Sequence, residues 1–308
     1  MTGNHEPIRS RYADVGGIRT HYLDAGDGPP VVLLHSGEFG ASAELCWEFN
    51  IGPLAREFRV IAPDWLGFGG TDKLHDFVSG SDRMIRHMSA FLRVMAVQEA
   101  DFVGASMGAT MLLREAARPD CRFPIRRLVV SSGGGFVPDN TERRRLLDYD
   151  GTHEAMRTLL RANFHDQSWA EDDAYVKRRV EASLAPGAWE AVATARLKPP
   201  TRPARSNFGQ PDTIEYERIG YPTLALAAAQ DKLRLPGYHQ ALTRIPGSRV
   251  VVLEDAGHLL NIEQADVFND LVRRFLLDRD ADAGANEPDA GANEPDAGAN
   301  EPDAGANE

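Results

Sequence analysis

Cysteine is scarce in this chain, which has only Cys46 and Cys121 among its 308 residues. So few cysteines do not make a disulfide scaffold, and they suit a reducing compartment such as the cytoplasm. The sequence also lacks the run of about 18 apolar residues that a membrane-spanning helix requires. The N-terminal segment MTGNHEPIRSRYADVGG has no apolar stretch, so we expect neither a signal peptide nor a membrane partner.

Basic residues are outnumbered by acidic ones, 34 to 46, which gives a net charge of −12 and argues against a nucleic-acid partner. From Asp282 onward there are four Asp, four Glu and no Lys or Arg, so −8 of that charge lies in repeated DAGANEP segments. Alanine is the only residue there that could fill a coiled-coil seam, and each copy carries Gly or Pro. We therefore expect residues 279–308 to be a disordered tail without a catalytic role.

The remaining chain, in a sequence that is 42% apolar, has enough hydrophobic residues for one large core. Short apolar runs predict strands that alternate with helical patterns, which indicates a mostly parallel sheet with helices on both faces. The methionines of the helical pattern Asp82–Val97 are interpreted as core residues. The expected strands are Ile18–Asp24 (an edge strand), Val31–Leu34, Val60–Pro63, the run before Gly104, Arg127–Ser132, Thr223–Ala229 and Val250–Leu253, and Ile262–Leu277 is a closing amphipathic helix.

Between the last of the early strands and Thr223 the pattern changes. Three helical stretches follow one another without a convincing buried strand: Thr141–Asn163, Ala170–Leu184 and Gly187–Leu197. We expect residues 136–210 to form a helical lid, and residues 1–135 and 211–278 to form the core domain.

The segment Asp101–Ala109, DFVGASMGA, contains a motif with a chemical meaning. An apolar run ends in Gly104-Ala105-Ser106-Met107-Gly108 and a helical pattern follows, which is the strand–turn–helix context of the G-x-S-x-G nucleophile elbow. Glycines relieve the crowding of such a tight turn. The motif predicts that Ser106 is a nucleophile and that the backbone N–H of Met107, at a helix N-terminus, binds an oxyanion.

Two further residues complete a catalytic set with Ser106. Asp231 and His258 each follow a predicted strand, so one edge of the sheet collects all three side chains. A serine hydroxyl needs a base, and an imidazole needs a carboxylate that fixes its tautomer. The chain order Ser, Asp, His is the order found in α/β-hydrolases. Glu254 and Asp255 compete for the carboxylate role, but they are too close to His258 along the chain, so Asp231 is preferred.

The loop after Val31–Leu34 is expected to supply the second oxyanion donor, from the backbone N–H of Ser36 or Gly37. His35 could be catalytic, but we interpret it as a structural residue because His258 already fills the base role.

On these motifs the body of the chain, Arg9–Leu277, resembles the α/β-hydrolase superfamily. The segments LLHSGEFGASAE, APDWLGFGGTDK and GASMGA are similar to those of the meta-cleavage-product hydrolases. The resemblance implies an α/β-hydrolase fold and hydrolysis of a carbon–carbon bond in a vinylogous diketone or keto-acid from aromatic ring cleavage. It also implies that a lid arginine, here Arg179, binds the substrate carboxylate with its planar fork. The alternative is that Arg179 is an exposed charge beside Lys177 and Arg178.

The sequence departs from that family at pocket positions. Ala105 stands where the family has Asn, Leu259 where it has Trp, and Cys46 where it has a second Asn, while Ser36 replaces a Gly. The expected substrate-binding set is Arg179, Ala105, Cys46, Leu259 and Phe39. The small or apolar side chains at the positions that depart from the family leave the substrate open.

The main hypothesis is therefore a cofactor-free and metal-free serine hydrolase of small molecules, with a homodimer as the assembly considered. In the implied mechanism His258 promotes ketonisation of a dienol, and Ser106 or a His-activated water attacks the carbonyl. The first alternative is a carboxylesterase or lactonase with the same triad. Others are a non-hydrolytic dioxygenase or lyase that uses His258 as base, and a binding module. Haloalkane dehalogenases and epoxide hydrolases use Asp at the elbow and are disfavoured.

Overall fold

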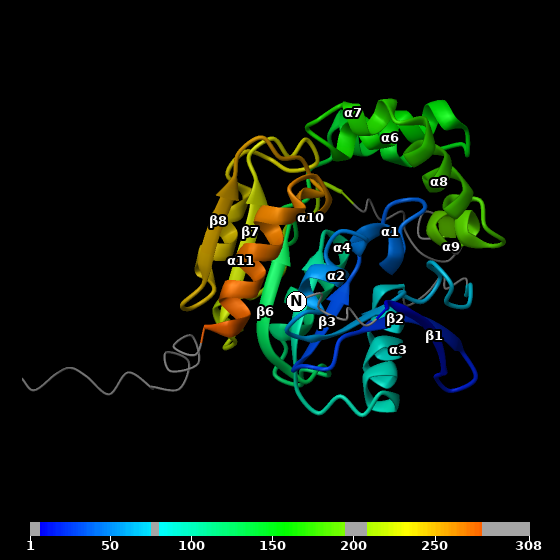
Figure 1. Ribbon diagram of the computed structural model, residues 1–308. Helices are drawn as coiled ribbons and strands as arrows, with labels where there is room; N and C mark the ends of the chain where they lie inside the picture. The colour runs from blue at the N-terminus through cyan, green and yellow to red at the C-terminus, as the bar shows by residue number, and fades with distance from the viewer. Residues whose placement is uncertain (1–6, 75–79, 195–207, 279–308) are drawn as a thin grey trace, which may run out of the picture.

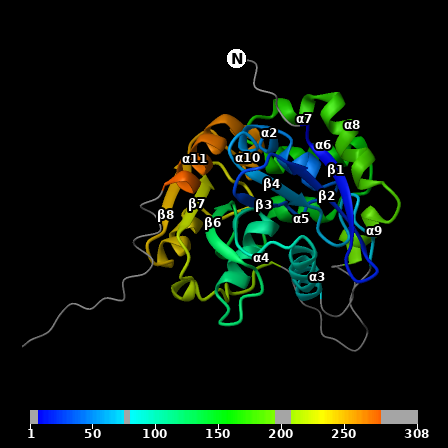
Figure 2. The same cartoon turned by 60° about the horizontal axis from the view of Figure 1, so that its bottom comes forward.

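A computed structural model of the chain describes residues 7–74, 80–194 and 208–278. One sheet of eight strands crosses the molecule in the order β1-β2-β4-β3-β5-β6-β7-β8 (Figures 1 and 2). The strands from β4 to β8 along this order are parallel to one another, whereas β2 is antiparallel to both of its neighbours, β1 and β4. This confirms the predicted α/β fold. The strands are β1 (Arg9–Asp14), β2 (Arg19–Ala25), β3 (Pro30–Leu34), β4 (Arg59–Pro63), β5 (Ala100–Ala105), β6 (Ile125–Ser131), β7 (Thr223–Ala228) and β8 (Arg249–Leu253).

The sequence analysis was wrong about one edge of the sheet. The segment predicted as an edge strand, Ile18–Asp24, forms β2, and β1 pairs outside it, with Arg9 opposite Asp24. Strand β1 escaped prediction because its residues are exposed and show no apolar alternation. At the other edge β8 is only partly buried, since Val252 is 37% exposed.

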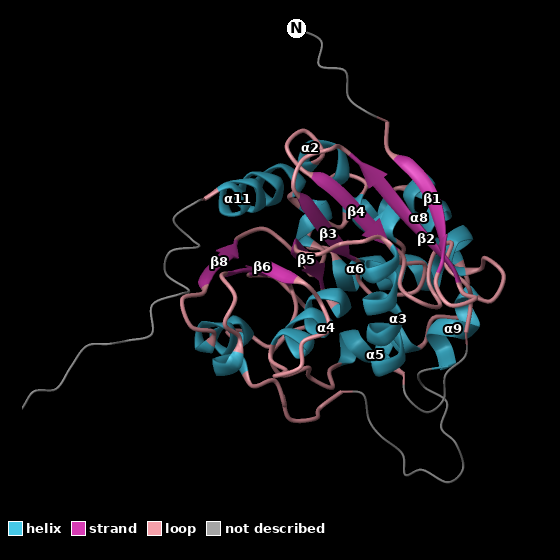
Figure 3. Cartoon of the chain, turned by 90° about the horizontal axis from the view of Figure 1, so that it is seen from below, coloured by secondary structure: helices cyan, strands magenta, loops and turns pink. Residues whose placement is uncertain are grey.

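Helices cover both faces of the sheet, as Figure 3 shows for α2 and α11 on one face and α3 and α4 on the other. Residues of β3 alternate between the two layers: Val31 and Leu33 pack toward α1, α2 and α11, and Val32 and Leu34 toward α3 and α4. The buried Met88 of α3 belongs to this core, as predicted. The helices are α1 (Ala43–Trp47), α2 (Ile51–Leu54), α3 (Ser81–Val94), α4 (Met107–Ala116), α10 (Leu260–Glu263), α11 (Ala265–Leu277) and the 3-10 helices η1 (Tyr216–Arg218) and η2 (Tyr238–Arg244). None of the helices in the described ranges is long and apolar enough to cross a membrane.

The chain between β6 and β7 forms a group of helices above the sheet, called the inserted helices below (Figure 1). They share an apolar cluster of their own with Phe39 and Leu259. The predicted stretch Thr141–Asn163 is broken, because Gly151 takes a left-handed φ of +88° and Thr152 caps a new helix. Residues 195–207 of the expected lid and the expected tail, 279–308, lie outside the described residues. The inserted helices are α5 (Thr141–Leu147), α6 (His153–Asn163), α7 (Ser168–Glu171), α8 (Asp173–Ser183) and α9 (Ala188–Thr194).

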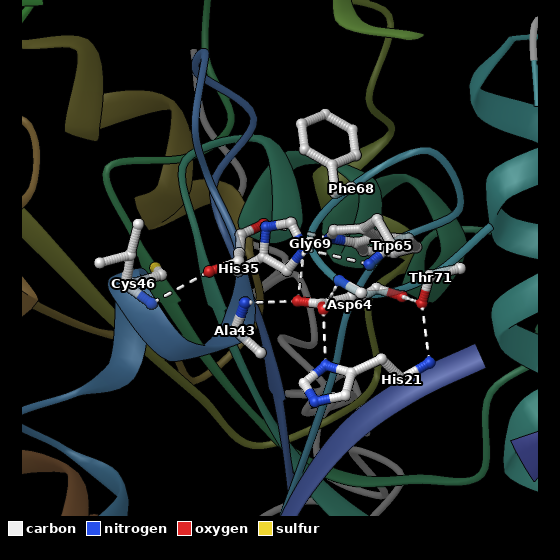
Figure 4. Close-up of polar contacts among 12 residues, drawn as sticks. His21, His35, Ala43, Cys46, Asp64, Trp65, Phe68, Gly69 and Thr71 are labelled. Carbon is white, nitrogen blue, oxygen red and sulfur yellow. Dashed lines mark hydrogen bonds and ion pairs between the residues drawn. The ribbon is translucent and has the colours of Figure 1, made fainter. Parts of the chain in front are cut away.

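The buried carboxylate of Asp64, just after β4, holds several segments together (Figure 4). Its Oδ1 accepts the backbone N–H of Ala43 at 2.6 Å, and its Oδ2 accepts the N–H of Gly70 and the Nδ1 of His21, both at 2.7 Å. Burial alone would raise the pKa of Asp64, but hydrogen bonds, first of all the one from His21, hold it below its ordinary value. One ionised carboxylate thus fixes α1, β2 and the loop after β4 relative to one another.

Removing this carboxylate should destabilise the fold. In Asp64→Ala, several buried donors lose their acceptor, at about 1–3 kcal/mol for each unpaired group. We expect the free energy of unfolding, measured by urea denaturation, to fall by about 3 kcal/mol or more. The control is Asp270→Ala, which removes an exposed α11 carboxylate paired with Arg274 and should cost less than about 1 kcal/mol. Equal losses in the two variants would contradict this role of Asp64.

Candidate active site

Ser106 lies at a sharp turn between β5 and α4, with a φ of +51° and a ψ of −107°. A non-glycine residue rarely adopts this backbone conformation, and such strain is typical of functional turns. The flanking glycines allow the turn because there is no room for a side chain at either position. A Cβ on Gly104 would lie 2.6 Å from the N of Ala109, and one on Gly108 would lie 2.2 Å from the O of Leu34. The predicted elbow is therefore present in its strand–turn–helix context.

The side chains of Ser106, His258 and Asp231 form one hydrogen-bonded series. Ser106 Oγ lies 2.7 Å from His258 Nε2, and His258 Nδ1 lies 2.7 Å from Asp231 Oδ2. The residues follow β5, β8 and β7, respectively. Ser106 is partly exposed, whereas the His258 and Asp231 side chains are buried. An ionised Asp231 accepts a hydrogen bond from the Nδ1–H of His258, which leaves the Nε2 lone pair facing the serine hydroxyl.

Asp231 is held in its ionised form. Burial would raise its pKa, but His258 and then the Arg234 guanidinium hold the pKa of Asp231 below its ordinary value. The N–H of Leu233 donates to Asp231 Oδ1 at 2.9 Å. Arg234 itself is buried and donates to the carbonyl oxygens of Gly134 and Ser132, at 2.6 and 2.7 Å. The sequence analysis missed Arg234, whose partners lie about a hundred residues away along the chain.

The loop that carries His258 is fitted against the inserted helices. A Cβ on Gly257 would lie 2.6 Å from the O of Asn163, at the end of α6, and the N–H of Leu259 donates to that same oxygen at 3.3 Å. The competing carboxylates face elsewhere: Glu254 accepts from Gln230, and the side chain of Asp255 is 86% exposed. The position of the imidazole thus depends on contacts from both the sheet and the inserted helices.

The expected oxyanion donors lie beside Ser106. Met107 is the first residue of α4, and the first N–H groups of a helix have no acceptor within the helix. The loop after β3 packs on this turn, because a Cβ on Gly37 would lie 2.5 Å from the Met107 Sδ. Ser36 is buried in the same loop, and its carbonyl lies 2.6 Å from His35 Nδ1. The residues named from the sequence for this role are therefore neighbours.

The contacts of His35 fit a structural role. Its Nε2 accepts the backbone N–H of Trp65 at 3.0 Å, and its carbonyl accepts the Trp65 indole N–H at 3.1 Å (Figure 4). Burial, the dominant influence, lowers the pKa of His35, so the ring is neutral at pH 7. These bonds fix the start of the loop that continues to Ser36 and Gly37.

The small and apolar residues expected near the substrate are all buried, but in different places. Ala105 and Cys46 belong to the core layer beneath α1 and α11, whereas Leu259 and Phe39 belong to the apolar cluster of the inserted helices. The Phe39 ring lies 4.8 Å from that of Tyr149. The Cys46 Sγ lies 3.6 Å from Ser36 Oγ, which brings α1 close to the loop after β3. In the described ranges, no group of His, Cys, Asp and Glu side chains is arranged to hold a metal ion.

Arg179 is fully buried on α8, and its Nη2 donates to Glu38 Oε1 at 2.6 Å. Its Nε and Nη1 have no hydrogen-bond partner among the described residues. The alternative of an exposed charge is therefore wrong for Arg179, although it holds for Arg178, which pairs with Glu48 at the surface. The sequence analysis did not predict that Glu38 pairs with Arg179. The only signal in the sequence was that Glu38 is an isolated acidic residue in a loop of small residues.

A second Ser–His–Asp series occurs near the β1 edge of the sheet. Ser10 Oγ lies 2.9 Å from His21 Nε2, and His21 Nδ1 lies 2.7 Å from Asp64. Ser10, however, lies inside the extended strand β1 opposite Leu23, not at a strained strand–helix turn. Asp64 is also occupied by backbone N–H groups. This series therefore serves the fold, whereas the Ser106 series lies at a strained turn beside the expected oxyanion donors.

Chemical labelling distinguishes the two serines. A fluorophosphonate should modify wild-type protein at Ser106, because the reaction requires an activated hydroxyl. Ser106→Ala should slow labelling by about 100-fold or more, whereas Ser10→Ala should leave the rate within about twofold of wild type. Intact-protein mass spectrometry follows the adduct. Undiminished labelling of Ser106→Ala would show that another residue is the reactive one.

Comparison with known proteins places this geometry among hydrolases. Residues 31–271 match the model of the alpha/beta hydrolase family. A curated relative, the 2-hydroxy-6-oxo-6-(2'-aminophenyl)hexa-2,4-dienoic acid hydrolase of Metapseudomonas resinovorans, is 33% identical over 86% of this chain and 90% of its own length. The 2-hydroxymuconate semialdehyde hydrolase of Pseudomonas sp. strain CF600 is 30% identical, over 91% of this chain and 98% of its own.

Solved structures agree with the sequence comparison. The meta-cleavage product hydrolase of Pseudomonas fluorescens IP01 superimposes with a TM-score of 0.76 and 28% identity, covering 87% of this chain and 97% of that chain. The similarity to meta-cleavage-product hydrolases expected from the sequence motifs is thus confirmed.

Proposed function

Because this chain belongs to the alpha/beta hydrolase family, we propose that it is a serine hydrolase whose catalytic residues are Ser106, His258 and Asp231. The observation that carries the proposal is the pair of 2.7 Å contacts that link the three side chains at the strained turn after β5. His258 takes the hydroxyl proton through Nε2 while Asp231 stabilises the imidazolium that forms. The N–H groups of Met107 and of Ser36 or Gly37 receive the negative charge that develops on the substrate oxygen.

The proposed substrate is a vinylogous diketone or keto-acid from aromatic ring cleavage, hydrolysed at a carbon–carbon bond. Curated relatives that are about 30% identical over most of the chain are named as hydrolases of hexadienoates and of a muconate semialdehyde. In the proposed sequence of steps, His258 first promotes ketonisation of the dienol, and Ser106 or a water activated by His258 then attacks the carbonyl. The free Nε–H and Nη1–H groups of Arg179 support its role as a ligand of substrate oxygen.

A carboxylesterase or lactonase with the same triad is the second candidate. Two observations favour it: Arg179 already has an anionic partner in Glu38, and the positions of Ala105 and Leu259 are buried and apolar. An ester or lactone carbonyl requires only the triad and the oxyanion donors.

The same proposal covers the compartment, the lid and the assembly of the protein. We infer a small-molecule enzyme of the cytoplasm, in which the inserted helices act as the lid of the site and a homodimer is the assembly to test. Close packing of Gly257 against Asn163 supports the idea that the lid and the His258 loop move together.

Ser106→Ala tests the nucleophile. Loss of the hydroxyl should lower kcat on the preferred substrate by a factor on the order of 10⁴ or more, since triad residues act as a unit. Single-turnover absorbance measurements with 2-hydroxy-6-oxo-6-phenylhexa-2,4-dienoate and with short p-nitrophenyl esters separate the two candidate substrates. Substantial turnover by the variant would instead favour a non-hydrolytic reaction with His258 as the base.

Asp231→Asn tests the orienting carboxylate. An amide in place of Asp231 presents an N–H to the imidazole and favours the wrong tautomer, so kcat should fall by a factor on the order of 10³ or 10⁴. Circular dichroism checks that the fold is retained. The matched control is Asp255→Asn. Asp255 is an exposed carboxylate three residues before His258, and its replacement by an amide should keep kcat within about twofold of wild type.

A further inference from the structure

A buried ion pair lies where the loop after β3 meets α8. Glu38 and Arg179 are 7% and 0% exposed, respectively, and are joined by a 2.6 Å contact. The loop is pressed on the helix at this point, since a Cβ on Gly40 would lie 2.5 Å from the Arg179 carbonyl oxygen. Both charges are therefore buried away from water. In the protein interior the effect of one charge on another is stronger than in water.

This pair adjoins the catalytic turn. Glu38 follows Gly37 directly, so their Cα atoms are about 3.8 Å apart, and Gly37 packs against the side chain of Met107. Ser36, on the other side of Gly37, helps to hold the pKa of Glu38 below its ordinary value. The pair thus adjoins the loop that carries the expected oxyanion donors beside Ser106.

The groups around the pair are neutral at pH 7. Burial raises the pKa of the Cys46 thiol to about 12 and also raises that of the Tyr175 phenol. Burial lowers the pKa of His35. Burial would also raise the pKa of Glu38, yet Arg179 and Ser36 hold it below its ordinary value, so the carboxylate is ionised. Among these groups the one positive charge is balanced by one negative charge.

The subsite nevertheless has unused hydrogen-bonding groups. Within the described residues, Arg179 Nε and Nη1 and the Tyr175 hydroxyl are buried without a hydrogen-bond partner. The guanidinium lies 5.9 Å above the Tyr175 ring. Buried donors without an acceptor are costly and call for a ligand atom. An oxygen acceptor would satisfy them, but a full negative charge would also face the Glu38 carboxylate.

We propose that Glu38 sets the charge preference of the substrate: its pairing with Arg179 makes this subsite electroneutral, so that the subsite favours an uncharged oxygen acceptor over a carboxylate. This inference rests on the proposed function, because it takes the triad as the place where the substrate reacts. It assigns Glu38 as a specificity-determining residue that acts by repelling an anionic substrate group.

A matched pair of substrates tests the proposal. The acid 2-hydroxy-6-oxo-6-phenylhexa-2,4-dienoate and its methyl ester have the same scissile bond and differ in one charge. Glu38→Gln keeps the shape of the side chain and removes its charge, so the ratio of kcat/KM for the acid to that for the ester should rise by about tenfold or more, through a lower KM for the acid. Glu38→Ala should shift the ratio in the same direction.

The control removes a comparable ion pair from the outer side of the same helix. Glu48, whose side chain is 18% exposed, contacts the exposed Arg178 at 2.7 Å, and Glu48→Gln should leave the acid-to-ester ratio within about twofold of wild type. A ratio that stays unchanged in Glu38→Gln, or equal losses for acid and ester, would show that Glu38 only supports the fold and would overturn the proposal.

A binding measurement separates this proposal from the proposed function. In the Ser106→Ala background, calorimetry with benzoate and benzamide reports the charge preference without turnover. Benzoate should gain about tenfold in affinity relative to benzamide when Glu38→Gln is added. If that gain appears while neither dienoate nor ester is hydrolysed by wild type, the proposed function fails and the charge preference stands. If turnover occurs but the gain does not, the charge preference fails alone.

Discussion

The hydrogen bond between Ser106 Oγ and His258 Nε2 is the contact on which the site depends. It joins residues 152 positions apart in the chain, one held at a strained turn after β5 and the other in a loop after β8. A serine hydroxyl is a weak nucleophile unless a base is in place to take its proton. The surrounding packing holds these two atoms at 2.7 Å, the distance that the proposed proton transfer requires.

Support comes from both layers of the molecule. The buried carboxylate of Asp64 fixes α1, where the loop after β3 ends, and His35 fixes the start of that loop through Trp65. Above the site, the backbone of Gly257 is fitted against the end of α6. A movement of the inserted helices would therefore change the position of His258, the proposed base.

The Ser106, Asp231 and His258 set could be predicted from the sequence, whereas strand β1 and the partner of Arg179 could not. The elbow at Ser106 is encoded by neighbouring glycines, and the strands before Asp231 and His258 are apolar runs, so their order along the chain was informative. Strand β1 has no apolar alternation and gave no signal. The pairing of Glu38 with Arg179 spans 141 residues, and neither residue type by itself indicates a buried partner. The resemblance to known enzymes indicated Arg179, but the residue that balances its charge emerges only from the structure.

A crystal structure of the fluorophosphonate adduct tests the central claim most directly. The account predicts phosphorus bonded to Ser106 Oγ, His258 Nε2 within hydrogen-bond distance of that oxygen, and the phosphoryl oxygen facing the N–H of Met107 and that of Ser36 or Gly37. An adduct on another side chain, or a phosphoryl oxygen turned away from both donors with His258 apart from Ser106, would contradict it.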